Sequence, residues 1–102
     1  MGKTINKTQH IFKISAQNKF NEIRVSLDKS SEIVTITGFR TTDYTALEQM
    51  WLMVNEYAKK NGAHKFMFNV QMKCEDLEMW LNIANDHIGY LMFSDGSVLF
   101  KK

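Results

Sequence analysis

Two segments between His10 and Asp28 alternate between apolar and polar positions with a period of two, as half-buried β-strands do. The alternation is clearest from Glu22 to Asp28, where every second residue is apolar and the residues between are charged or carry a hydroxyl group. A shorter alternation runs from His10 to Ser15. In the segment from Ile33 to Thr37, the residues on both faces are apolar or β-branched, which predicts a central strand covered on both sides.

After these three predicted strands the spacing of apolar residues changes to that of an α-helix. We expect this helix to begin between Thr41 and Thr45, because Thr45 and Glu48 have the spacing of a capping box. It should end at Gly62, which can take the left-handed conformation that closes a helix. Its predicted apolar stripe is Leu47, Met50, Trp51, Val54 and Ala58.

A buried strand should follow, because Phe66, Phe68 and Val70 share one face. A shorter helix comes next, with Glu75 and Asp76 in its first turn, where the helix dipole favours negative charge. The predicted stripe of this second helix is Leu77, Trp80, Leu81 and Ala84.

Two strands, Ile88 to Phe93 and Ser97 to Lys101, should close the chain as a hairpin around an Asp-Gly turn. The predicted order is β-β-β-α-β-α-β-β. Because the long helix must cross over to a parallel neighbour, the fold class is α+β with a mixed, mostly antiparallel sheet. We expect residues 9–102 to form one domain after a flexible amino terminus at residues 1–8, and the first and last strands to lie at sheet edges.

Two segments resemble helix and strand segments of a known protein family. Val54 to Ala63 is similar to the end of a long helix in that family, and Leu77 to Leu81 followed by His87 to Tyr90 is similar to its short helix and next strand. Residues 32–102 as a whole resemble the cofactor-binding half of the Gcn5-related N-acetyltransferase (GNAT) family, with a few extra residues before Gly89. The resemblance implies a GNAT-like core. It also implies that acetyl-CoA, if used, would be held by the loop Arg40, Thr41, Thr42, Asp43, Tyr44 and Thr45.

That loop departs from the family's pattern. Asp43 and Thr45 stand where the family has glycines, whose backbone amides hold pyrophosphate. Trp80 and Leu81 stand where the family often has a proton-donating tyrosine, and Tyr90 is a nearby substitute that matches a core aromatic instead. Two helices that help the family bind its acceptor have no counterpart in the pattern. We therefore expect a reduced or degenerate GNAT-like fold with no catalytic residues and no cofactor, the alternative being an acetyl-CoA-dependent N-acetyltransferase with an atypical loop.

The composition changes this picture only slightly. A hydrophobic content of 44% argues against a disordered chain. Cys74 is the single cysteine and cannot form an internal disulfide, and the sequence shows neither a signal peptide nor an apolar run that could span a membrane, so we expect a cytoplasmic protein. His10, His64 and His87 are scattered along the sequence, which predicts no metal site.

The charge is distributed unevenly. The net charge is +2, but residues 1–29 hold six basic residues against two acidic ones, whereas residues 30–102 hold seven against nine. A basic amino-terminal segment could bind a nucleic-acid backbone, or it could be a solvated arm and edge strand protected by lysines. The lysines before the first acidic residue are Lys3, Lys7, Lys13 and Lys19.

We therefore predict a small, non-catalytic α+β protein that binds a macromolecule, either another protein or a second copy of itself. Its size and its lysine-rich, proline-free composition are typical of an inhibitor or accessory factor such as a phage encodes against its host. Nucleic-acid binding is a second alternative. Several flexible or aromatic side chains lie beside the apolar stripes and suit adaptable contacts, namely Met53, Tyr57, Met72 and Met79. The candidate binding residues are Glu75, Asp76 and Glu78 on the second helix and Ile11, Phe12 and Lys13 on the first strand.

Overall fold

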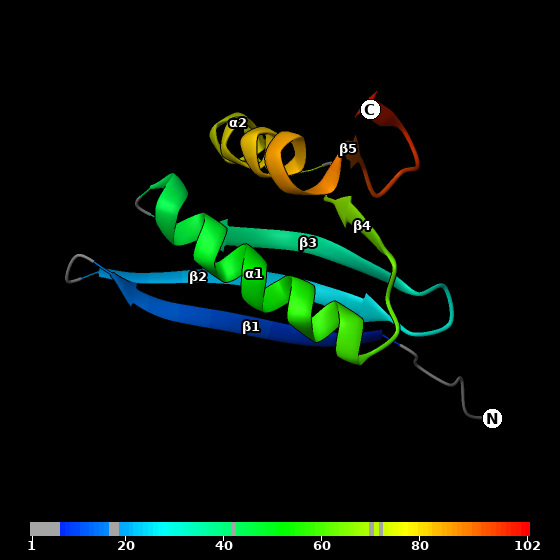
Figure 1. The fold of residues 1–102 in the computed structure, drawn as a ribbon, viewed down its shortest axis with the longest axis horizontal. Helices are drawn as coiled ribbons and strands as arrows, with labels where there is room; N and C mark the ends of the chain where they lie inside the picture. The colour runs from blue at the N-terminus through cyan, green and yellow to red at the C-terminus, as the bar shows by residue number, and fades with distance from the viewer. Residues whose placement is uncertain (1–6, 17–18, 42, 70, 72) are drawn as a thin grey trace.

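A computed structural model describes residues 7–16, 19–41, 43–69, 71 and 73–102, which form one small α+β domain (Figure 1). The elements in chain order are β1 (Lys7–Ala16), β2 (Lys19–Asp28), β3 (Ile33–Arg40), α1 (Tyr44–Lys60), β4 (Lys65–Phe68), α2 (Cys74–Ile83), a π-helical turn η1 (Ala84–Ile88), β5 (Tyr90–Met92) and β6 (Val98–Lys101). The predicted class and order of strands and helices are confirmed. Of the predicted flexible terminus, residues 1–6 lie outside the described residues, and Lys7 and Thr8 belong to β1.

The main sheet has the strand order β1-β2-β3-β4. Its first two pairs are antiparallel, and β4 joins β3 in parallel after α1 crosses over, so the predicted mixed sheet is confirmed. β5 and β6 were expected in the same sheet but form a separate antiparallel pair. A parallel bridge between Phe68 and Phe93 joins the two sheets, and the Ser94 backbone N–H donates to the Phe68 carbonyl oxygen at 2.9 Å.

Both helices pack on the same face of the main sheet. Val34 and Ile36 of β3 are fully buried beneath them, whereas Thr35, which points the other way, is only partly buried. The prediction that this strand is covered on both sides is therefore wrong. Among the described residues no helix lies on the second face, which we call the uncovered face, and its threonines and serines tolerate water there because they carry hydroxyl groups.

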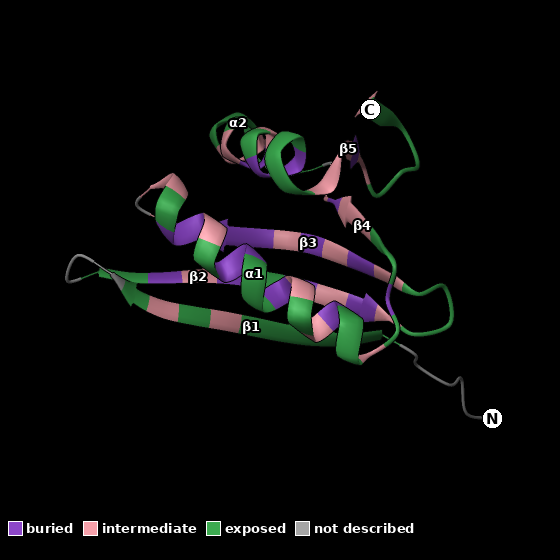
Figure 2. Cartoon of the chain, in the orientation of Figure 1, coloured by how far each residue is buried: buried purple, intermediate pink, exposed green. Residues whose placement is uncertain are grey.

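Aromatic rings join the helices to the sheet. Trp80 of α2 stacks on Phe68 of β4 with ring centroids 5.7 Å apart, and it meets Trp51 of α1 edge to face at 5.8 Å. The stripe of α1 is confirmed, and its buried residues alternate with exposed ones along the helix (Figure 2). In α2, Trp80 is buried as predicted and Ile83, which the sequence pattern omitted, is buried as well. The predicted core residue Val70 lies outside the described residues.

Helix α1 begins at Tyr44, within the predicted interval from Thr41 to Thr45, but its cap is not the one that the capping-box pattern indicated. Asp43 is the N-cap, and its Oδ1 accepts a hydrogen bond from the Ala46 backbone N–H at 2.8 Å. Thr45 lies inside the helix, so the predicted Thr45 cap is wrong. Aspartate caps a helix more strongly than threonine does, and the cap at Asp43 lets the helix begin earlier, at Tyr44. The predicted end is confirmed, since Gly62 has a φ of 73°. No helix within the described ranges combines the length and apolar character needed to cross a membrane.

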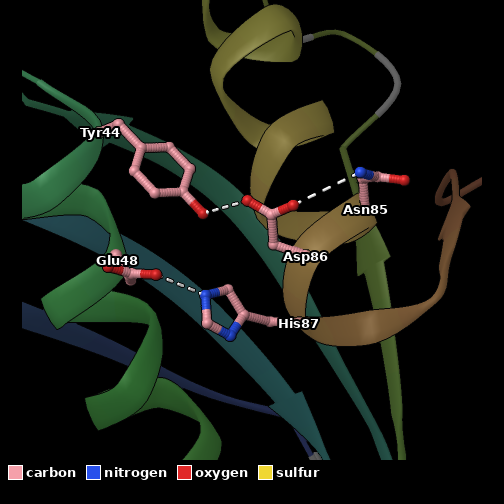
Figure 3. A network of polar contacts seen from close by, with 5 residues as sticks. All are labelled: Tyr44, Glu48, Asn85, Asp86 and His87. Carbon is pink, nitrogen blue, oxygen red and sulfur yellow. Dashed lines mark hydrogen bonds and ion pairs between the residues drawn. The ribbon is translucent and has the colours of Figure 1, made fainter.

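Ala84–Ile88 form the π-helical turn η1. The Gly89 backbone N–H donates to the Ala84 carbonyl oxygen at 2.8 Å, and Gly89 closes the turn with a φ of 94°. Ile88 is therefore the last residue of this turn rather than the first of a strand, and β5 begins at Tyr90. The wide turn keeps Ala84 buried and directs Asp86 and His87 toward α1 (Figure 3).

Candidate interaction surface

Strand β1 is an edge of the main sheet, as predicted. It pairs with β2 along its whole length, and no described strand pairs with its other side. Side chains alternate along it, so that Phe12 faces α1 while Ile11 and Lys13 face the uncovered side. Ile11 is 49% exposed, whereas Phe12 is partly buried. The three candidate residues therefore lie together on an unpaired edge, but on two different faces of it.

Three rings fix α1 over this edge. His10 of β1 stacks on Tyr57 of α1 with ring centroids 4.9 Å apart, and Phe12 meets the same tyrosine edge to face at 5.4 Å. His10 and Phe12 also contact each other, at 4.3 Å. Aromatic contacts of this kind stabilise beyond the area that they bury. The carboxyl-terminal half of α1 is therefore held above β1.

A shallow, open groove lies along this half of α1 where the helix meets Phe12 of β1, and we call it the β1–α1 groove. It has a volume of about 460 Å³ and is lined by Phe12, Leu52, Met53, Glu56, Tyr57 and Lys60. Leu52 is 52% exposed and Met53 is 37% exposed. Exposed apolar side chains gathered in a groove beside an unpaired strand are the features that protein-binding surfaces present.

The off-stripe residues that the sequence pattern singled out are divided by the structure. Met53 and Tyr57 line the groove, as a contact surface would require. Met79 is instead partly buried against the core, and Met72 lies outside the described residues.

The loop that the family resemblance assigns to coenzyme A leads into α1. The Asp43 carboxylate accepts a hydrogen bond from the backbone N–H of Ala46 in the first turn of the helix. Thr41 Oγ1 lies 3.1 Å from both Asn21 Oδ1 and the Asp43 carbonyl oxygen. A carboxylate at a helix amino terminus takes the place that a phosphate would occupy and repels it. The residues present therefore do not fit a pyrophosphate group. Thr42 lies outside the described residues.

The acidic residues of α2 do not form a purely acidic surface. Glu75 and Asp76 line a hollow of about 340 Å³ together with three cations, Arg24, Arg40 and Lys73. Glu22 also lines it and lies 3.8 Å from the Arg24 guanidinium. Opposite charges therefore balance within this hollow. Glu78 is exposed outside its lining.

A polar network joins the amino-terminal half of α1 to the π-helical turn (Figure 3). The Tyr44 hydroxyl donates to Asp86 Oδ2 at 2.7 Å, and His87 Nε2 lies 2.7 Å from Glu48 Oε2. Asn85 Nδ2 donates more weakly to Asp86 Oδ1, at 3.4 Å. Partial burial raises the pKa of Tyr44 well above its ordinary value, and the hydrogen bond and charge of Asp86 and the charge of Glu48 add to the rise. Tyr44 therefore keeps its proton, and can donate this hydrogen bond, to a higher pH than an ordinary tyrosine would.

The His87–Glu48 pair would need a nucleophile or a substrate cavity to act in catalysis. The hollow beside His87 measures about 160 Å³, below the usual size of a substrate pocket, and its lining contains no serine, threonine or cysteine in the described part of the chain. Tyr90, which shares this hollow, accepts a hydrogen bond from the Phe66 backbone N–H at 2.9 Å. These contacts hold the elements together.

The structure brings two of the three histidines to one place. His64 and His87 line the same small hollow, although the sequence separates them, while His10 lies on β1. Among the described residues no group of three ligating side chains could hold a metal ion. Cys74 is exposed at the start of α2, and Trp80 is in the core.

Comparison with protein-family models, curated protein sequences and solved structures finds no match for this chain.

Proposed function

We propose that this protein works in the cytoplasm as a non-catalytic binding protein, an inhibitor or accessory factor such as a phage encodes, and that it binds another protein at the β1–α1 groove and the adjoining edge of β1. The observation that carries the proposal is the groove, where Leu52 and Met53 remain exposed beside Phe12 and Tyr57. Exposed apolar side chains do not stabilise the folded monomer, whereas covering them with a partner contributes free energy to binding.

The size of this gain can be estimated. Full burial of a leucine or methionine side chain contributes about 1.5–3 kcal/mol, so covering the exposed parts of Leu52 and Met53 is worth on the order of 1 kcal/mol each. Phe12 and Tyr57 already form a rigid apolar floor, which lowers the entropy lost on binding. Backbone pairing with β1 would add hydrogen bonds along the edge.

The test is affinity capture from an extract of the native cells, read by mass spectrometry. The variant Leu52→Glu/Met53→Glu should lose the partner, because two charges then occupy the groove. The control Val98→Glu/Leu99→Glu changes two residues of β6 that are 47% and 54% exposed, and it should retain the partner. Equal capture by both variants would contradict the proposal, as would equal loss.

We also propose that the core is a reduced GNAT-like fold. What supports this is the parallel step from β3 through α1 to β4, followed by α2 and a terminal hairpin. The Asp43 cap argues against coenzyme A binding. A ligand at one hundred times its Kd would stabilise the fold by about 2.7 kcal/mol, or several degrees in Tm for a domain of this size. We expect no shift at millimolar coenzyme A, and a clear shift would favour the acetyltransferase alternative.

A further inference from the structure

We propose that the segment of the partner that binds is an extended, acidic stretch of polypeptide, which adds to β1 as a fifth strand and places alternate apolar side chains in the β1–α1 groove. This inference rests on the proposed function and names the chemistry of its partner.

The backbone of β1 supplies the first argument. The strand has ten residues and, in the described part of the chain, its outer side has no strand partner. Unpaired N–H and C=O groups along such an edge accept a further strand, with hydrogen bonds that do not depend on the added sequence. At about 3.3 Å per residue, the edge is long enough to pair with most of a ten-residue segment.

The position of the groove sets the apolar pattern of the added strand. Successive side chains of a strand point to opposite faces, so every second residue of the fifth strand would face α1. That is the side on which Leu52, Met53 and Tyr57 line the groove. The remaining side chains would face the uncovered side, beside Ile11 and Lys13. The partner segment should therefore alternate, with apolar residues at every second position.

The charges around the edge indicate the sign of the charge that the partner segment should carry. In the groove lining the charges of Lys60 and Glu56 balance, whereas the strand itself carries Lys13. Lys7 lies at one end of β1, where it borders a hollow on the uncovered face. Asp28 and Glu22 of β2 lie opposite Lys7 and Lys13 in the strand register, but β1 itself, the strand that a further strand would contact, carries no acidic residue. An edge strand whose charged side chains are lysines attracts an acidic segment and speeds its association.

The same charges disfavour the other occupants. A second copy of the chain would bring the same lysines to the shared edge, where like charges repel. A nucleic acid would satisfy the lysines, but it offers no strand backbone to pair with β1 and would leave the apolar lining of Leu52 and Met53 uncovered. An acidic polypeptide would pair with the backbone of β1, cover the groove and neutralise the lysines together.

The probe for this inference is a display library of random twelve-residue peptides, selected on the whole protein. Enriched peptides should alternate apolar residues with aspartate or glutamate. The affinity of one enriched synthetic peptide should fall roughly five- to tenfold for Lys13→Gln/Lys60→Gln and change less than twofold for the control Lys65→Gln/Lys101→Gln. The control lysines are exposed on β4 and β6. Circular dichroism melting would confirm that each variant folds, and amide hydrogen exchange should slow along β1 when the peptide binds.

Other outcomes overturn the inference. Enriched peptides without an acidic bias, or no enrichment at all, would remove the acidic extended segment, while the capture experiment with the Leu52→Glu/Met53→Glu variant would still decide the proposed function separately. A dimer on sizing that is lost in the Leu52→Glu/Met53→Glu variant would replace the acidic segment with a second copy. Binding of a single-stranded DNA oligonucleotide at 50 mM salt that needs Lys13 but tolerates Leu52→Glu would replace it with nucleic acid.

Discussion

The two halves of α1 differ in how completely their side chains are used within the molecule. At the amino-terminal half, Asp43 caps the backbone, and Tyr44 and Glu48 bind the π-helical turn. At the carboxyl-terminal half, Leu52 and Met53 stand exposed over β1. The first half is already occupied by internal contacts, and the second half offers surface that another molecule can cover. The difference separates contacts that hold the fold from surface that can serve function.

The largest expected effect comes from the core beneath the amino-terminal half. Trp80→Ala removes a ring that is 2% exposed and that stacks on Phe68. Large-to-small changes of this kind cost about 3–5 kcal/mol, so chemical denaturation should show a loss of that order. A loss below about 1 kcal/mol would mean that α2 contributes little to the fold.

The cap of α1 gives the next effect. Asp43→Ala removes the acceptor for the Ala46 amide and should lower the free energy of unfolding by about 1 kcal/mol. Thr45→Ala is the matched control, because the capping-box pattern placed the cap there, and it should be close to neutral. If the two variants lost stability equally, Asp43 would not be the dominant cap.

Tyr44 gives a pH dependence with a definite sign. The pKa of Tyr44 in the folded state lies above its ordinary value of 10.0. The contribution of protonated Tyr44 to the free energy of unfolding is therefore fully present below about pH 10. It should decline as pH rises above 10, because the unfolded chain can then release that proton and the folded chain cannot. Denaturation at pH 9 and at pH 11 should therefore show a smaller loss in Tyr44→Phe than in the unmodified protein. An equal loss in both proteins would contradict the assignment.

The smallest effect on folding is expected at the other half of the helix. Leu52→Glu/Met53→Glu changes exposed side chains, so the free energy of unfolding should change by less than about 1 kcal/mol. The same variant should abolish capture of the partner. A large loss of stability would show that these residues belong to the core and would remove the contrast between the two halves.

Periodicity predicted the elements because each helix or strand buries one face. The pattern in β2 and the stripe of α1 are read locally, and both were correct. The uncovered side of β3 was mispredicted because β-branched residues suit either a buried face or a wet one, and only the placement of both helices on one side decides which.

The candidate surface was predictable only in parts. Phe12, Met53 and Tyr57 were each singled out, but their meeting depends on how α1 crosses β1, which no local pattern contains. The network of Tyr44, Asp86 and His87 was missed because its members are far apart in sequence and a π-helical turn aligns them. Asp43 was noted as a poor phosphate ligand, and its capping role became visible only in three dimensions.

The π-helical turn also has a consequence for helical phase. An α-helix rotates by about 100° per residue, and a π-helical turn contains one residue more than an α-helical turn for the same rotation. Removing the exposed Asn85 would restore ordinary spacing between Ala84 and Gly89 and would rotate Asp86 and His87 away from α1. The extra residue thus sets the angular register between the end of α2 and the terminal hairpin, and length in this segment is less free to vary than in an ordinary surface turn.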